Sequence, residues 1–393
     1  MSNMKNRFPS WPMATEREEK ELLEALHSNQ WWRMTGTKVK EFEHVFAEMH
    51  ESKYALGVTN GTHAIELLLR SFQVKPGDEV IVPAFTFIST ALPVMSLGAI
   101  PVPVDIDPET FCIDPEKVRE AVTEKTVGII PVHMAGHMCD MDRLQQIADE
   151  FNLFILEDAC HAHGGEWKGK RAGSIGDAGV FSFQQFKLMT AGEGGALVTN
   201  TQELYEQAFL YHNVGRPLGD KKYHHIVEGS NYRLSEFQAA VLLPQTGRLA
   251  EQNECRERNA RILDGEMRNI EGIIPQGRQA ECTVHTHYMY MFYYHPEKFG
   301  GISRERFVEM LNEQGIPAFI AYTQIHDTPI FQEFVAKLGD TYTFPNQLNC
   351  PVSKKVAEEV IWIHHRALLG DEDTTKGIAQ TIREIQSGVE ARI

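Results

Sequence analysis

Phe154-Ile155-Leu156-Glu157-Asp158 is the stretch that decides the fold, because an apolar run of this length that ends in acids is typical of a buried strand. Four similar apolar runs precede it, at residues 55–59, 79–83, 100–105 and 127–132. Helical patterns separate the runs, and Asn60 to Ala64 is typical of a turn that opens a helix over residues 65–72. Strands that alternate with helices predict an α/β fold with a largely parallel sheet.

The 393-residue chain continues on both sides of the segment that forms this sheet. We expect three parts: an N-terminal helical segment over residues 1–50, a large domain over 51–250 and a smaller C-terminal α+β domain over 251–393. Amphipathic helices are predicted at 16–28 and 39–50, and a long helical run from Ser235 to Met267 links the two domains. Pro244 should bend or divide that run.

Charge and composition argue against several classes of function. Lys and Arg total 38 against 54 Asp and Glu, a formal net charge of −16, which has the wrong sign for a nucleic-acid-binding protein. The N-terminal residues are polar and no run approaches the roughly 20 apolar residues that cross a bilayer, so we expect a cytoplasmic protein with no membrane partner. The six cysteines form no C-x-x-C pair and the paired histidines lack the spacing of zinc ligands, so we expect no metal.

Lys187 lies in Phe186-Lys187-Leu188-Met189-Thr190-Ala191-Gly192-Glu193-Gly194-Gly195, a glycine-rich turn after a strand. Asp158 ends the buried strand quoted above, where an unpaired carboxylate would be costly. Pyridoxal 5'-phosphate requires an amine for a Schiff base, an acid at its pyridine nitrogen and donors around its phosphate. The pattern is therefore typical of a pyridoxal phosphate site. The plain alternatives are a surface lysine for Lys187 and a salt bridge or helix cap for Asp158.

Gly61 and Thr62 are candidates for phosphate binding. They open the helix that follows the first strand, where backbone N–H groups attract an anion and glycine permits close approach. Taken alone, Asn60-Gly61-Thr62 is only a turn signal. Arg233 could cap a helix or pair with a carboxylate of a substrate or amino donor.

Five motifs in order along the chain resemble the signatures of the DegT/StrS-type sugar aminotransferases: Asn60-Gly61-Thr62, Pro83-Ala84-Phe85-Thr86-Phe87, Glu157-Asp158-Ala159-Cys160-His161, the Lys187 segment through Gly195, and Gly229-Ser230-Asn231-Tyr232-Arg233. The resemblance spans nearly the whole chain, from Phe8 to the last helix. These proteins are fold-type I pyridoxal phosphate enzymes. The resemblance therefore implies a seven-stranded, mostly parallel sheet between helices, with a smaller C-terminal α+β domain.

The resemblance also implies a role for each site residue. Lys187 would form the Schiff base and then act as base and acid, Asp158 would hold the pyridine nitrogen, and His161 would contact the cofactor ring or its phenolic oxygen. Phe87 would stack on that ring, with a place in the core as its alternative. The phosphate ligands would be Gly61, Thr62, Ser182 and Gln184, together with Asn231 from a neighbouring subunit. A homodimer with shared active sites follows.

Four stretches look most like the branch of this family that contains 3-amino-5-hydroxybenzoate synthase: residues 30–34, 132–136, 187–195 and 362–366. Ordinary sugar aminotransferases carry a Leu-Pro-Leu type segment at the last of these, so the resemblance argues against a standard nucleotide-sugar substrate. Donors there would suit a carboxylated, polyhydroxylated ring, and an exposed basic turn predicts the same sequence. The residues expected at the substrate are Arg233, Tyr322, His364, His365 and Arg366.

Two activities are compatible with these residues, and amino transfer is the first interpretation. An amino group would pass from glutamine or glutamate to a keto-sugar, keto-cyclitol or related ring in secondary-metabolite or sugar biosynthesis. The alternative is 3-amino-5-hydroxybenzoate synthesis, in which an aminodehydroshikimate loses water and becomes aromatic. Both need Lys187, and its presence excludes the pyridoxamine-dependent dehydrases of the family, which carry histidine there. A non-enzymatic regulator with the same fold is a further hypothesis, but an intact pair of Lys187 and Asp158 would then be superfluous and the sequence shows no fused DNA-binding module.

Overall fold

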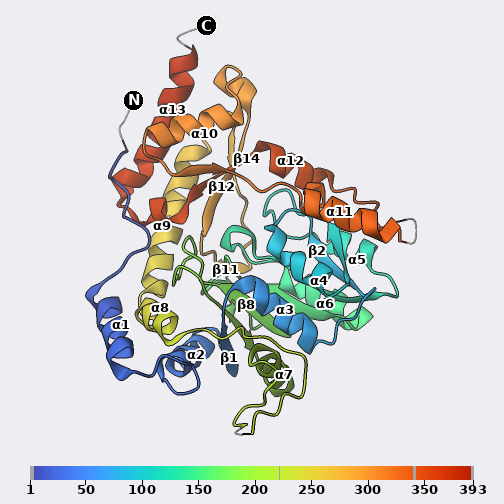
Figure 1. The fold of residues 1–393 in the computed structure, drawn as a ribbon. Helices are drawn as coiled ribbons and strands as arrows, with labels where there is room; N and C mark the ends of the chain where they lie inside the picture. The colour runs from blue at the N-terminus through green and yellow to red at the C-terminus, as the bar shows by residue number, and fades with distance from the viewer. Residues whose placement is uncertain (1–3, 221, 340–341, 391–393) are drawn as a thin grey trace.

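A seven-stranded sheet forms the centre of the larger part of the molecule (Figure 1). The structure is a computed structural model and describes residues 4–220, 222–339 and 342–390. The strand order is β1-β9-β8-β5-β4-β2-β3; β9 runs antiparallel to β1 and β8, and the other neighbours are parallel. The strands are β1 (Tyr54–Val58), β2 (Glu79–Pro83), β3 (Ile100–Val104), β4 (Thr126–Ile129), β5 (Phe154–Asp158), β8 (Ala178–Ser182) and β9 (Gly195–Thr199). The predicted α/β fold with a largely parallel sheet is confirmed.

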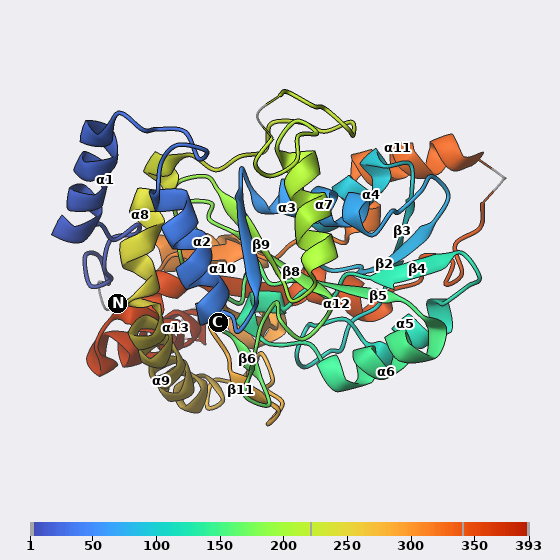
Figure 2. The same cartoon turned by 90° about the horizontal axis from the view of Figure 1, so that it is seen from below.

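Helices cover both faces of this sheet, and Figure 2 shows α3, α4 and α7 on one side with α5 and α6 on the other. The helices are α3 (Gly61–Ser71), α4 (Leu92–Ser96), α5 (Pro115–Ala121), α6 (Met141–Phe151) and α7 (Gln202–His212). Strands buried on both faces consist of continuous apolar residues, and every residue of β2, β3 and β9 is buried. The predicted bounds of β2 and β5 match the structure for this reason.

Two helices precede the sheet, as expected: α1 (Glu16–Ser28) and α2 (Lys38–Met49). Thr15 caps α1 in a capping box with Glu18, which satisfies backbone N–H groups at the start of the helix. The long helical run after Ser235 is divided, as predicted, into α8 (Glu236–Thr246) and α9 (Leu249–Met267). Pro244 lies in the last turn of α8, where it lacks an N–H for the helical ladder.

The C-terminal part contains an antiparallel sheet in the order β10-β12-β14-β13. Its strands are β10 (Ile273–Pro275), β12 (Met289–Tyr294), β13 (Ala318–Ile320) and β14 (Val360–His364), and the helices of this part are α10 (Arg304–Glu313), α11 (Pro329–Leu338), α12 (Pro351–Glu359) and α13 (Glu372–Glu390). A small third sheet joins β11 (Cys282–Val284) to the hairpin of β6 (Glu166–Trp167) and β7 (Lys170–Arg171). The smaller α+β part is present as expected.

The buried apolar side chains form two clusters, one around each main sheet. Met4 packs into the C-terminal cluster, whereas Phe331 and Phe344 pack into the larger one, so the chain crosses between them more than once. The domain boundaries at residues 50 and 250 stay predictions. No helix in the described ranges is both long and apolar enough to span a membrane.

Candidate active site

A cavity of about 760 Å³ lies where the strands of the large sheet end. Asp158 and Ser182 are the last residues of β5 and β8, and Gly61 begins the helix after β1. The carboxyl ends of parallel strands meet at one edge of a sheet, which is where ligands bind in such folds. Phe319 and Trp362 come from β13 and β14, so the C-terminal sheet supplies part of the opposite wall.

The structure brings most of the sequence-predicted residues to this cavity. Those that line it are Gly61, Thr62, Phe87, Asp158, His161, Ser182, Gln184, Lys187 and Tyr322. They come from five separate segments of the chain, so the convergence is a property of the fold rather than of any one motif.

Lys187 is held in a turn, as the glycine-rich sequence indicates. Its backbone N–H donates to the carbonyl of Gln184 at 2.9 Å, and its ammonium lies 4.3 Å from the centre of the Tyr288 ring. Gly192 has a φ of 81° and Gly194 a φ of 155°, backbone conformations that favour glycine. The turn thus points an amine into a largely buried site beside an aromatic face.

Asp158 is buried and receives two hydrogen bonds. Thr90 donates its hydroxyl to Oδ2 at 2.9 Å, and the backbone N–H of Cys160 donates to Oδ1 at 3.2 Å. The structure gives this carboxylate no ion-pair partner among the described residues, so the salt-bridge alternative has no support. A carboxylate oriented by two donors at the floor of a cavity is suited to holding a positive charge on a ligand.

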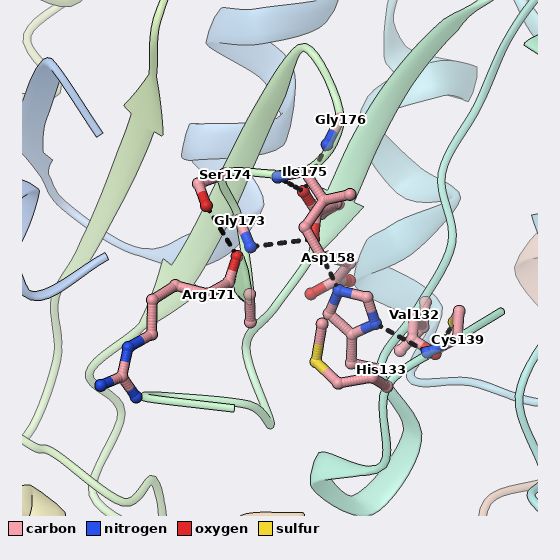
Figure 3. A network of polar contacts seen from close by, with 12 residues as sticks. Val132, His133, Cys139, Asp158, Arg171, Gly173, Ser174, Ile175 and Gly176 are labelled. Carbon is pink, nitrogen blue, oxygen red and sulfur yellow. Dashed lines mark hydrogen bonds and ion pairs between the residues drawn. The ribbon is translucent and has the colours of Figure 1, made fainter. Parts of the chain in front are cut away.

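The neighbouring Glu157 points to the other face of β5, since successive side chains of a strand alternate. It is fully buried and accepts from four donors: His133 Nε2 and Gly173 N at 2.9 Å, and Ile175 N and Gly176 N at 2.7 Å. Figure 3 shows these groups converging beside Asp158. Glu157 therefore fixes the strand end that carries Asp158, whereas the sequence marks it only as the first acid of a pair.

His161 is buried and stacks on Tyr288, with ring centres 4.3 Å apart. Burial, and then the charge of Lys187, hold the pKa of His161 well below its ordinary value, so the ring is neutral near pH 7. Its Nδ1 has no hydrogen-bond partner in the described part of the chain. This buried polar atom on the cavity wall is free to contact a ligand.

The start of α3 forms an anion cradle. The first N–H groups of a helix have no partner within the helix, and Asn60 Oδ1 accepts only that of His63, at 2.8 Å. A Cβ on Gly61 would lie 2.9 Å from Cys160 Sγ and 3.2 Å from the Cβ of Ser182, so a larger residue would crowd the cradle. Ser182 and Gln184 stand beside it on the cavity wall. The donor set suits a phosphate group.

Phe87 and Tyr322 face each other across part of the cavity, with ring centres 6.0 Å apart. Phe87 is 55% exposed, so the alternative of a core-filling aromatic is wrong. Burial raises the pKa of Tyr322 above its ordinary value, so the phenol stays protonated.

Five candidates lie outside the cavity lining: Asn231, Arg233, His364, His365 and Arg366. Asn231 is exposed, and Arg233 donates to Asn213 Oδ1 at 3.0 Å. The interpretation of residues 364–366 as an exposed basic turn is wrong, because both histidines are buried and burial lowers the pKa of His364 to about 3. His365 Nε2 donates to the carbonyl of Phe186 at 3.0 Å, so it supports the lysine turn from behind. The substrate roles of these residues stay predictions.

Sequence reasoning missed several cavity residues, among them Thr90, Phe186, Tyr288, Phe319 and Trp362. Each comes from a different segment. Phe186 and Trp362 stand in stretches that the sequence singles out for other residues, and no local pattern marks the other three. In the described ranges, no group of three His, Cys, Asp or Glu side chains is arranged to hold a metal ion.

Comparison with known proteins agrees with this geometry. The model of the DegT/DnrJ/EryC1/StrS aminotransferase family matches residues 13–383. The chain belongs to that family. A 3-amino-5-hydroxybenzoate synthase from Amycolatopsis mediterranei is 45% identical over 96% of this chain and 97% of that protein. An L-glutamine:2-deoxy-scyllo-inosose aminotransferase from Streptoalloteichus tenebrarius is 34% identical over 96% of this chain and 94% of that one.

Comparison with solved structures also finds members of this family. A crystal structure of 3-amino-5-hydroxybenzoic acid synthase matches with a TM-score of 0.90 and 42% identity over the full length of both chains. A protein from Streptococcus pneumoniae named as a sugar aminotransferase, solved in its PLP form, matches with a TM-score of 0.84 and 28% identity over 97% of this chain and 98% of that one. The fold is that of the fold-type I aminotransferases, and the family depends on pyridoxal phosphate.

The residues of this site fit that cofactor on chemical grounds. The cavity offers an amine, a doubly hydrogen-bonded carboxylate, a helix N-terminus that a Cβ on Gly61 would crowd, and an unpartnered nitrogen of His161. These groups match the aldehyde, the pyridine nitrogen, the phosphate and the ring edge of pyridoxal phosphate.

Proposed function

We propose that this chain forms 3-amino-5-hydroxybenzoate from an aminodehydroshikimate. The observation that carries the proposal is the 45% identity to 3-amino-5-hydroxybenzoate synthase along nearly all of both chains. The reaction removes one ring proton and one hydroxyl group as water, and the ring ketone becomes a phenol. Atoms and electrons balance without an oxidant, so the cofactor and one acid–base group suffice.

Pyridoxal phosphate, when bound, supplies an electron-accepting ring that stabilises negative charge on carbon. Lys187 would hold the cofactor and, once displaced by the substrate amine, remove the ring proton and return a proton to the departing hydroxyl. Asp158, oriented by Thr90, would keep the pyridine nitrogen positively charged. Gly61 and Thr62, with the nearby Ser182 and Gln184, would bind the phosphate.

The charges on the cavity wall support a free ring as the substrate. Among the described residues that line the cavity, Lys187 is the one lysine or arginine, and Asp158 and Glu193 are the acids. A nucleoside diphosphate carries charge that binding sites usually meet with arginine or lysine. The wall therefore favours a small carbocycle over a nucleotide-linked sugar.

Amino transfer is the second candidate. The L-glutamine:2-deoxy-scyllo-inosose aminotransferases, at 34% identity, are named for it, and Lys187 and Asp158 could serve both reactions. The visible spectrum of the purified holoenzyme separates the two. Conversion of the bound cofactor to its pyridoxamine form by L-glutamine or L-glutamate would favour amino transfer. A spectrum that persists with both donors is the result expected of the synthase.

A homodimer with shared sites is part of the proposal, with Asn231 completing the phosphate site of the neighbouring subunit. Its exposed position outside this chain's own cavity supports that role. Mixing Lys187→Ala and Asn231→Ala subunits tests it, because a mixed dimer would regain one intact site. No recovery of activity after mixing, with exchange of subunits verified by native mass spectrometry, would refute shared sites.

A further inference from the structure

Phe319 and Trp362 form one continuous aromatic surface on the cavity wall. They stand opposite each other in the register of β13 and β14, and their rings stack with centres 4.5 Å apart and planes 20° apart. Trp362 Nε1 donates to the carbonyl of Ile320 at 3.1 Å, so the one polar group of the indole is already satisfied. The surface that the pair offers to a ligand is therefore carbon.

Two further aromatic side chains line the same cavity, and both are unusually exposed to solvent for residues of this type. Phe87 is 55% exposed and Phe186 is 47% exposed. The ring of Phe186 is held edge-on against His364, with centres 5.7 Å apart. Large apolar side chains that face a cavity in this way are typical of a binding surface, because soluble proteins rarely leave such rings uncovered without a function.

The proposed reaction changes the shape of the ring that this surface would meet. A cyclohexene with several tetrahedral carbons is puckered, whereas the aromatic product is flat. A flat ring can stack over its whole face on an aromatic surface, and such stacking stabilises a complex beyond the effect of the area that it buries. A contact that improves as the ring flattens lowers the barrier to the extent that the ring is already flatter in the transition state than in the bound substrate.

We propose that the Phe319–Trp362 pair is a platform that binds the flattening ring of the substrate in preference to the puckered ring. This inference rests on the proposed function and deepens it, since it assigns the selection of ring shape to two residues. It also assigns the cofactor half of the cavity to Asp158, Lys187 and the start of α3, and the ring half to the C-terminal sheet.

Equilibrium binding to the holoenzyme tests the platform without turnover. The probes are 3-hydroxybenzoate, a flat carboxylated ring, and shikimate, a puckered one, each titrated by isothermal calorimetry. Wild-type enzyme should bind 3-hydroxybenzoate more tightly. Trp362→Ala should weaken 3-hydroxybenzoate binding by about 3–10-fold, the size of one stacking contact, and shikimate binding by less than about 2-fold. Trp362→Phe should retain most of the preference.

Phe151→Ala is a matched control for Phe319→Ala. Both phenylalanines are 39% exposed, and Phe151 lies on α6 away from the cavity lining. Phe319→Ala should reduce the preference for the flat ring, and Phe151→Ala should leave it unchanged. Melting temperature and cofactor content report whether each variant is folded. If an alanine variant does not fold, Trp362→Phe still measures the preference for the flat ring.

Equal weakening of both probes in Trp362→Ala, or no preference in the wild type, would overturn the platform. The proposed function has a separate outcome, which is formation of 3-amino-5-hydroxybenzoate from an aminodehydroshikimate. An enzyme that prefers the flat probe but makes no such product would retain the platform and lose the proposed function. An enzyme that makes the product but binds the flat and the puckered probe equally would retain the proposed function and lose the platform.

Discussion

Glu157→Gln should lower the stability of the protein, because its buried carboxylate meets only donors. Oε1 accepts from Ile175 N and Gly176 N at 2.7 Å, and Oε2 accepts from Gly173 N and His133 Nε2 at 2.9 Å. Glutamine has the same shape but can accept on one atom only. If its oxygen takes the place of Oε1, its NH₂ group faces two donors and both of those hydrogen bonds are lost.

The magnitude follows from those two bonds. A hydrogen bond to a charged group contributes about 1.5–3 kcal/mol, so the variant should lose about 3–6 kcal/mol. His133 cannot relieve its contact by changing tautomer, because its Nδ1 already accepts from the N–H of Cys139 at 3.1 Å. Since unfolding entropy grows with chain length, a chain of this size shifts its melting temperature by roughly 1–2 °C per kcal/mol. The expected fall is about 3–12 °C.

Thermal unfolding followed by circular dichroism measures this fall in the apo and the cofactor-loaded protein. Glu358→Gln is the control, because Glu358 is an exposed residue of α12 and its replacement should shift the melting temperature by about 1 °C or less. If the melting temperature of Glu157→Gln is as close to that of the wild type as the control's is, the carboxylate does not stabilise the strand end as its four hydrogen bonds indicate.

Three further predictions concern the site and the N-terminal helix. Lys187→Ala should abolish both the visible band of the lysine-bound cofactor and turnover, and full activity in this variant would contradict the assignment. Asp158→Asn should keep the cofactor bound, by fluorescence and content assay, and lower kcat by at least roughly 10²-fold; near-normal kcat would refute its role. Burial opposes ionisation of Glu18, but hydrogen bonds from Thr15 and Arg248 outweigh burial and lower its pKa. Its contribution to stability is therefore present above the ordinary pKa and is lost as pH falls through the lowered one. Glu18→Gln should melt below the wild type at about pH 7, and the difference should shrink as pH falls below the ordinary pKa of a glutamate. A difference that persists in acid would contradict this.

Much of the large sheet could be predicted from sequence because its strands are buried on both faces. β2 and β5 were predicted with their observed bounds, and the helix break after Pro244 was predicted as well. The meeting of Asp158 and Lys187 at one cavity follows from strand order, since β5 and β8 are parallel neighbours and the lysine turn comes directly after β8. These features depend on local pattern and simple topology.

Other parts of the site depend on contacts that no local pattern records. Thr90, Tyr288 and Trp362 reach the cavity from segments far apart in the chain. In the sequence, Trp362 stands at the start of a stretch that differs from ordinary sugar aminotransferases, and the polar residues after it are the ones that predict substrate contacts. In the structure His364 and His365 are buried behind the lysine turn, and the indole before them lines the cavity.

The choice between the two reactions could not be made from the catalytic residues, because both reactions need the same lysine and acid. Amino transfer was the first interpretation of the sequence, and the comparisons support its alternative better. The cavity lining bears on the substrate and not on the reaction: aromatic side chains and a single lysine line it, which suits a free ring better than a nucleotide-linked sugar, whichever reaction follows.

The most direct test of the account is to incubate the holoenzyme with 5-amino-5-deoxy-3-dehydroshikimate in the absence of any amino donor and to follow the products by chromatography and ultraviolet absorbance. The account predicts 3-amino-5-hydroxybenzoate in many-fold excess over enzyme, and none with Lys187→Ala. No aromatic product from an enzyme whose cofactor is converted by L-glutamine would contradict it and would establish amino transfer instead.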